Sequence, residues 1–184
     1  MHKASKKSVW AALTLSIVLS ISFSSDQISP RLKEKIDAAI HSTYGITDFE
    51  LKRIAVQSEW DKRTPAALGG ENLFEIFRAK QLHGYLYLGE APSKKRKFDY
   101  VILFTPNFTV KKTKVLIYRE DFGQQIGSQR WLKQFIGFTL VDHPSYGENI
   151  DAISGATISA SSMTRAIGDV LTSLRILKEK ELIP

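Results

Sequence analysis

The chain has 184 residues, which is enough for one ordinary domain and a short additional segment. Its 26 basic and 19 acidic residues give a net charge of +7; without Lys3, Lys6 and Lys7 the count is 23 against 19, or +4. This balance predicts a mildly basic solvated surface and argues against a nucleic-acid-binding protein. Cysteine is absent, which excludes a disulfide framework, a thiolate metal site and a lipid-anchored cysteine.

The first 25 residues have the composition of an export signal. Three lysines precede an apolar run over residues 9–23, which is interrupted by serines. That run is short for a membrane span, which needs about 20 residues. Residues 22–24, Ser-Phe-Ser, offer a small-x-small cleavage pattern. Residues 1–25 are therefore expected to be either a cleaved signal peptide or an uncleaved anchor helix. In both cases the protein is exported, to the periplasm or the outer face of the cytoplasmic membrane.

The segment after this signal begins with a predicted helix. Pro30 is suited to the first helical position, apolar residues recur at helical spacing as far as Tyr44, and Gly45 is a natural stop. Residues 49–56 alternate imperfectly and predict a strand, whereas residues 60–70 predict a loop. The apolar patch at residues 73–77 is expected to form a helical turn or a loop that plugs the core.

The middle of the chain is rich in strand patterns. Residues 84–89, 98–105 and 110–118 each predict a strand, and short turns separate them. Such spacing favours an antiparallel sheet. The basic run at residues 94–97 is expected to be a loop tip between two of these strands. The predicted fold is α+β, an antiparallel sheet flanked by helices, in one domain over residues 30–184.

A second helix is predicted from Ser128 to Gly137, because Trp131, Leu132 and Phe135 recur at intervals of three and four. Its aromatic stripe, like the pair Tyr85 and Tyr87 in the strand region, is interpreted as core packing. The histidines are scattered without metal-ligand spacing, so no metal site is expected; they are His2, His41, His83 and His143.

Small and polar residues gather immediately before the last predicted helix. They are Asp151, Ser154, Gly155, Ala156 and Thr157. The helix that follows has an apolar face made by Met163, Ile167, Val170, Leu171 and Leu174. Its N-cap is expected to be one of the serines, Ser159, Ser161 or Ser162. A helix start in a loop of small residues suits a phosphate group, because the amide hydrogens there are unpaired.

The run Asp151-Ala-Ile-Ser-Gly-Ala-Thr157 resembles the Asp-x-x-Ser/Thr-Gly-Ala-Thr signature of the FMN-binding domain family. This family includes the flavin subunits of the sodium-pumping NADH:quinone reductase and the related ferredoxin:NAD complex. Its last threonine carries FMN through a phosphoester bond made by a separate FAD-dependent flavin transferase. The resemblance, which covers about residues 84–175, implies that FMN is attached to Thr157. It also implies that the transferase reads Asp151 and residues 154–156, and that the amides of residues 158–160 neutralise the phosphoester.

A second resemblance lies in the loop after the third strand of the middle region. Residues 120–125, Glu-Asp-Phe-Gly-Gln-Gln, are similar to a Glu-Thr-Pro-Gly-Leu-Gly loop that approaches the flavin ring in the family. Trp131, Gln134 and Phe135 stand where the following helix of the family has Trp and Gln-Phe. The resemblance makes Glu120 and Gly123 candidate contacts of the ring, whereas Ile158 is a candidate contact of the phosphoester through its backbone amide. The sequence departs from the pattern at Phe122, which replaces proline, and at residues 124–125.

The motifs together predict an extracytoplasmic electron-transfer protein with covalent FMN on Thr157. Its expected partners are the flavin transferase and a membrane redox protein that donates electrons. No general base or nucleophile elbow accompanies Thr157, which is less typical of a stand-alone enzyme. Two alternatives remain open: a flavin subunit of a membrane ion-pumping reductase complex, and a periplasmic binding or interaction module with an unmodified Thr157.

Overall fold

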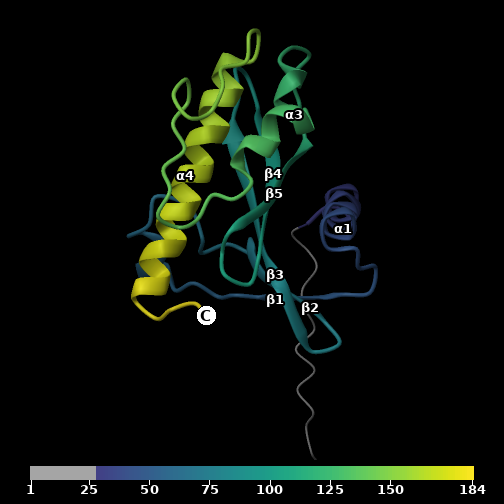
Figure 1. Cartoon of the computed structure of the whole chain (residues 1–184), viewed down its shortest axis with the longest axis vertical. Helices are drawn as coiled ribbons and strands as arrows, with labels where there is room; N and C mark the ends of the chain where they lie inside the picture. Colours follow the sequence, from purple (N-terminus) through teal and green to yellow (C-terminus); the bar gives the residue numbers. More distant parts are fainter. Residues whose placement is uncertain (1–27) are drawn as a thin grey trace, which may run out of the picture.

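The computed structural model describes residues 28–184 and places five strands in one sheet between helices (Figure 1). The expected signal or anchor segment, residues 1–25, lies outside the described residues. From residue 28 onward, no helix combines the length and the apolar character that a membrane span requires. The predicted α+β class and antiparallel sheet are confirmed.

The strands follow one another through the sheet in chain order, and each is antiparallel to the next. They are β1 (Glu50–Arg53), β2 (Leu73–Arg78), β3 (Gln81–Pro92), β4 (Lys97–Phe104) and β5 (Val110–Ile117). The expectation of a helical turn or loop plug at residues 73–77 was wrong, because this patch forms β2. Apolar residues stand on both sides of Glu75 without alternation and hid the strand period, since side chains on both faces of β2 are buried.

The sheet separates two hydrophobic cores, and alternate residues of its central strands supply them. On β4, Tyr100 and Ile102 face one core while Val101 and Leu103 face the other. This division explains why the central strands are apolar at nearly every position. The interpretation of the tyrosine pair in β3 as core is confirmed, because Tyr85 and Tyr87 are buried.

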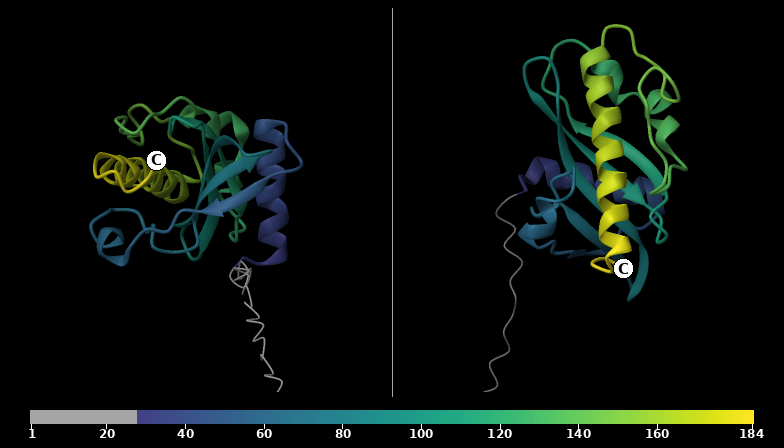
Figure 2. Two further views of the ribbon diagram at one scale, coloured as in Figure 1. Left: turned by 90° about the horizontal axis from the view of Figure 1, so that it is seen from below. Right: turned by 90° about the vertical axis from the view of Figure 1, so that its left-hand side faces the viewer.

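Helix α1 (Pro30–Tyr44) covers one face of the sheet, as the left view of Figure 2 shows. Its start is capped by Ser29, whose hydroxyl accepts a hydrogen bond from the Leu32 amide at 3.3 Å. Its end is set by Gly45, which adopts a left-handed φ of 69°. These boundaries agree with the prediction.

The opposite face is covered by α4 (Thr157–Glu179) and by a chain of short helices (Figures 1 and 2). These are η2 (Gln124–Gly127), α3 (Gln129–Leu132) and η3 (Lys133–Phe135), so the helix predicted from Ser128 is present as two short pieces. A further short helix, α2 (Ser58–Asp61), overlaps the start of the predicted loop.

The start of α4 differs from the prediction. The helix begins at Thr157 with Ala156 as its N-cap, so the expectation of a cap at Ser159, Ser161 or Ser162 was wrong. The chain turns earlier, at Gly155, whose φ is 77°. The serines lie within the first turns of the helix, where their hydroxyls are available for contacts with other segments.

Candidate functional site

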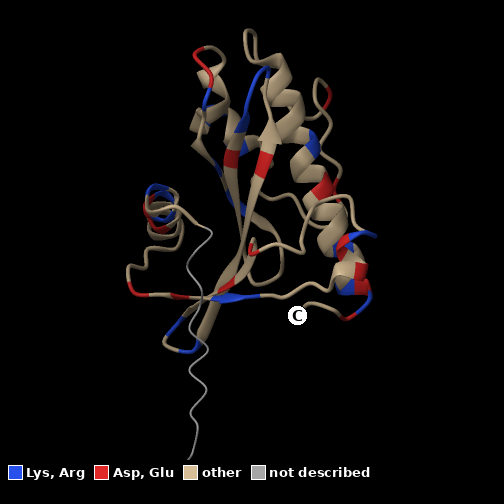
Figure 3. Cartoon of the chain, turned by 180° about the vertical axis from the view of Figure 1, so that it is seen from behind, with Lys and Arg blue, Asp and Glu red and all other residues tan. Residues whose placement is uncertain are grey.

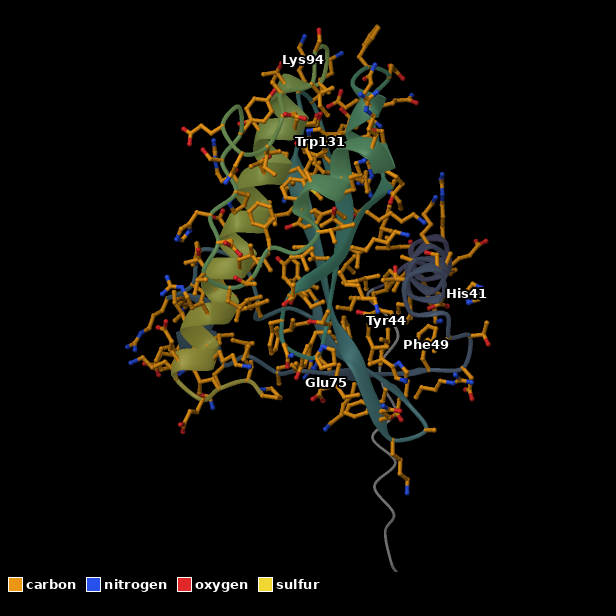
Figure 4. The ribbon with its side chains drawn as sticks, in the orientation of Figure 1. His41, Tyr44, Phe49, Glu75, Lys94 and Trp131 are labelled. Atoms are coloured by element: carbon orange, nitrogen blue, oxygen red, sulfur yellow. The ribbon has the colours of Figure 1, made fainter. Side chains whose placement is uncertain are left out.

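A pocket of about 530 Å³ lies at the end of the sheet where α4 begins. Three segments form it: the β3–β4 turn at residues 93–96, the loop after β5 at residues 118–122, and the start of α4 at residues 155–159. The two motifs that the sequence analysis singled out are about 35 residues apart in the chain, yet the fold brings both to this pocket. Figure 4 places Lys94 at this end of the molecule, at the top of the view, with Trp131 below it.

Thr157 is an exposed residue on the wall of the pocket and the first residue of α4. Because Ala156 has no polar side chain, no cap hydrogen bond satisfies the amides of the first helical turn. These N–H groups and the positive end of the helix dipole lie beside the Thr157 hydroxyl and favour an anion there. Ile158, also on the wall, is 54% exposed.

Glu120 lines the pocket and fixes the opposite turn. Its Oε1 accepts hydrogen bonds from the backbone amides of Lys95 and Arg96, at 2.6 and 2.9 Å. These two amides hold the pKa of the Glu120 carboxyl below its ordinary value. Glu120, which the family resemblance makes a candidate contact of the flavin ring, therefore also joins the loop after β5 to the β3–β4 turn.

Three hydroxyl groups join the three segments at the base of the pocket. The Ser159 hydroxyl lies 2.7 Å from that of Ser93 and 2.9 Å from that of Tyr118, and the last two are 3.2 Å apart. Tyr118 also donates to the carbonyl of Phe122 at 3.1 Å. Ser93 and Tyr118 could not be predicted from the sequence, since isolated hydroxyl residues at strand ends carry no spacing signal.

Gly123 lies behind the pocket wall and does not line it. Its φ is 79°, and a Cβ atom added to it would meet the Tyr118 hydroxyl at 2.9 Å, the Gly155 carbonyl at 3.3 Å and the Ala156 Cβ at 3.4 Å. Glycine at this position allows the loop after β5 to lie directly against the loop that carries Thr157.

The loop before Thr157 is held from its other side by the helix that follows β5. The indole Nε1 of Trp131 donates to the Asp151 carbonyl at 2.7 Å, and the Gln134 side-chain oxygen accepts from the Asp151 amide at 2.9 Å. The Asp151 and Ser154 side chains are exposed and lie outside the pocket. The predicted site residues that line the pocket are Glu120, Gly155, Ala156, Thr157 and Ile158.

The basic run proves to be part of this site. Residues 93–96 form the β3–β4 turn, in which the Ser93 amide donates to the Arg96 carbonyl at 2.8 Å. The prediction of a loop tip is confirmed for residues 94–96, whereas Lys97 begins β4. The position of the tip on the pocket wall could not be inferred from the sequence. Lys94, Lys95 and Arg96 place three positive charges across the pocket from Thr157.

Residues 94–172 match the family model of the FMN-binding domain. The match covers 79 of the 184 residues, and this stretch is similar to the FMN-binding domain. The resemblance drawn from the two motifs is thus confirmed. The matched region begins in the β3–β4 turn and ends within α4, so it includes every residue that lines the pocket except Ser93. No curated protein matches the sequence.

The pocket fits the cofactor that the family binds. Its volume lies within the range of about 300 to 1,000 Å³ that is usual for small-molecule sites. It combines unpaired amides and cations, which suit a phosphate, with two exposed apolar side chains, Phe122 and Ile158, which suit a ring system. Within residues 28–184, no three acidic or histidine side chains are grouped so that they could hold a metal ion.

Proposed function

We propose that this protein is an extracytoplasmic electron-transfer flavoprotein that carries FMN covalently on Thr157 through a phosphoester bond. The observation that carries the proposal is the place of the Thr157 hydroxyl. It is exposed on the wall of a flavin-sized pocket, at an uncapped helix start, within an FMN-binding domain.

The attachment needs little chemistry from the chain itself. In the proposed step, the Thr157 oxygen forms a bond to the FMN phosphorus of FAD, the phosphoanhydride bond breaks, AMP leaves, and the hydroxyl proton is released. Among residues 28–184 the Thr157 hydroxyl has no hydrogen-bond partner in the structure. This supports a threonine that is presented to a separate flavin transferase.

The pocket is well suited to keep the phosphoester once it has formed. A phosphate diester retains one negative charge, and the first-turn amides of α4 offer hydrogen bonds to it at the positive end of the helix dipole. Lys94, Lys95 and Arg96 add positive charge from the opposite wall. Ile158, beside Thr157, offers apolar surface to the ring.

Bound FMN supplies one- and two-electron transfer, and the chain sets how electrons reach it. The pocket opens at the surface, where a redox protein can approach it. A membrane redox protein as donor and a location outside the cytoplasm are part of the proposal. They are supported by the export-type composition of residues 1–25.

The test is to express the protein with a flavin transferase and to measure its intact mass and visible absorbance after denaturation. The expected product is yellow and heavier by one FMN less one water. Thr157→Ala should stay colourless and unmodified, whereas Thr157→Ser should accept FMN because it keeps the hydroxyl. Wild type that stays unmodified beside an active transferase would contradict the proposal and favour an unflavinylated binding module. Co-purification with membrane subunits would identify a subunit of a reductase complex.

A further inference from the structure

We propose that the rim of the pocket is a docking surface for an acidic electron-acceptor protein. The surface consists of Lys94, Lys95 and Arg96, here called the basic tip, together with the exposed apolar side chain of Phe122. The inference rests on the proposed electron-transfer function and adds to it the chemical class of the partner.

The first observation is that the charges of the basic tip are unpaired. Lys97, one residue beyond the tip, pairs with Glu90 at 3.2 Å. Arg119, on the facing loop, pairs with Asp99 at 2.6 Å. Among residues 28–184, however, none of the three side chains of the basic tip takes part in an ion pair. The positive charges of Lys97 and Arg119 are thus neutralised locally, whereas the three side chains of the basic tip are exposed to solvent. Figure 3 shows this basic segment at the same end of the molecule as the start of α4.

The second observation is that the basic tip is held in one conformation. The turn is closed by the bond from the Ser93 amide to the Arg96 carbonyl, and Glu120 accepts from the amides of Lys95 and Arg96. These bonds use backbone groups and one carboxylate, so they fix the turn without engaging its cationic side-chain ends. A preorganised charged surface loses less entropy when a partner binds.

The third observation is the exposed apolar surface beside the basic tip. Phe122 is 85% exposed and lines the same pocket as the basic tip. An apolar centre with charged residues around it is the usual anatomy of a specific protein interface. Complementary charge at its rim mainly raises the association rate, which is the need of a short-lived electron-transfer complex.

A protein fits this surface better than a membrane does. The pocket that is proposed to hold the flavin opens between the basic tip and the start of α4. A lipid surface seated on the same residues would cover the pocket and separate it from any redox partner. An acidic redox protein seated there would instead bring its own cofactor to the pocket. Each electron that leaves the reduced flavin would then reduce one acceptor centre.

The experiment uses acidic cytochrome b5 and basic cytochrome c as ferric probes. Flavinylated, pre-reduced protein is mixed with each probe in a stopped-flow instrument between about 10 mM and 500 mM salt, and haem reduction is followed. The test variant is Lys94→Glu/Lys95→Glu. The matched control is Lys62→Glu/Lys80→Glu, which makes the same change of charge at exposed residues outside the pocket. Lys80 precedes β3, whereas Lys94 follows it, so they lie at opposite ends of a 12-residue strand.

The expected rate constant for cytochrome b5 is highest at low salt and falls as salt screens the charges. The test variant should lose at least about tenfold at low salt, and the control should lose much less. Rates that are independent of salt, or equal losses in both variants, would overturn the inference. So would binding to phosphatidylglycerol vesicles that is lost in the test variant while the cytochrome rates are kept.

The test also separates this inference from the proposed function. Affinity for cytochrome b5 is measured by calorimetric titration of the Thr157→Ala protein, which carries no flavin. Salt-sensitive binding that the Lys94→Glu/Lys95→Glu change abolishes supports the docking surface even if Thr157 never accepts FMN. Flavinylated protein that shows no such binding refutes the docking surface and leaves the carrier function intact.

Discussion

Gly123 packs against the loop that carries Thr157, so Gly123→Ala tests the contact between this loop and the loop after β5. The glycine has a φ of 79°, in the left-handed region, and it is buried. A Cβ atom there would lie 2.9 Å from the Tyr118 hydroxyl and 3.3 Å from the Gly155 carbonyl. The substitution therefore strains the backbone and crowds the contact between the two halves of the pocket.

The two effects can be given magnitudes. A residue with a side chain costs about 1 to 2 kcal/mol in the left-handed region. The crowded Cβ forces the Tyr118 hydroxyl to move, and this hydroxyl belongs to the cluster with Ser93 and Ser159. Each hydrogen bond weakened there contributes about 0.5 to 1.5 kcal/mol. We expect Gly123→Ala to lower the free energy of unfolding by about 2 to 4 kcal/mol. For a chain of this size, that corresponds to a fall in melting temperature of roughly 4 to 16 °C.

Gly147→Ala is the matched control, because it separates strain from crowding. Gly147 has a φ of 83°, and nothing lies within 4 Å of an added Cβ atom. Gly147→Ala should therefore lower the free energy of unfolding only by the cost of the left-handed conformation, about 1 to 2 kcal/mol. Urea unfolding followed by circular dichroism gives both values. If Gly123→Ala costs no more than Gly147→Ala, the reasoning about contact between the two loops is refuted.

Three further predictions concern side chains in and around the pocket. Two backbone amides lower the pKa of Glu120 from 4.5, so the contribution of this carboxylate to stability is complete above that value and is lost on acidification. The free energy of unfolding of the wild type, measured in urea, should therefore fall below pH 4.5 more steeply than that of Glu120→Gln, and parallel curves would contradict this. Trp131→Phe removes the hydrogen bond to the Asp151 carbonyl and should lower the free energy of unfolding by about 1 to 2 kcal/mol, as measured by circular dichroism; no loss would show that the loop is held otherwise. Burial raises the pKa of Asp169 above 3.8, so ionisation of this carboxyl costs stability as pH rises. Asp169→Asn should therefore stabilise the protein more at pH 7 than at pH 3, and a larger stabilisation at pH 3 would exclude the desolvation argument.

Local signals in the sequence were sufficient for most of the fold. Ser29 and Pro30 mark the start of α1, and Gly45 marks its end. The strands of the middle region are indicated by apolar runs between short turns. The strand β2 was missed because a strand buried on both faces has no alternation to read. The start of α4 was misplaced because three serines offered better caps than Ala156, and tertiary contacts use Ser159 and Ser162 instead.

The candidate site was predictable only where residues follow one another in the chain. The Thr157 loop and the Glu120 loop each carry a recognisable motif, and the fold brings them together. The third wall, residues 93–96, carries no motif and reaches the pocket through the length of the β3–β4 hairpin, which no sequence pattern specifies. Similarly, the bond between Trp131 and Asp151 depends on a tertiary approach across 20 residues of chain.

Mapping the modification to a single residue shows whether Thr157 carries the FMN. Trypsin cleaves after Lys133 and Arg165 and releases residues 134–165 as a single peptide, which contains Thr157 and its serine neighbours. Fragmentation of this peptide from protein made with a flavin transferase should place the added mass on Thr157. The added mass on Ser154 or Ser159, or an unmodified peptide, would contradict the account.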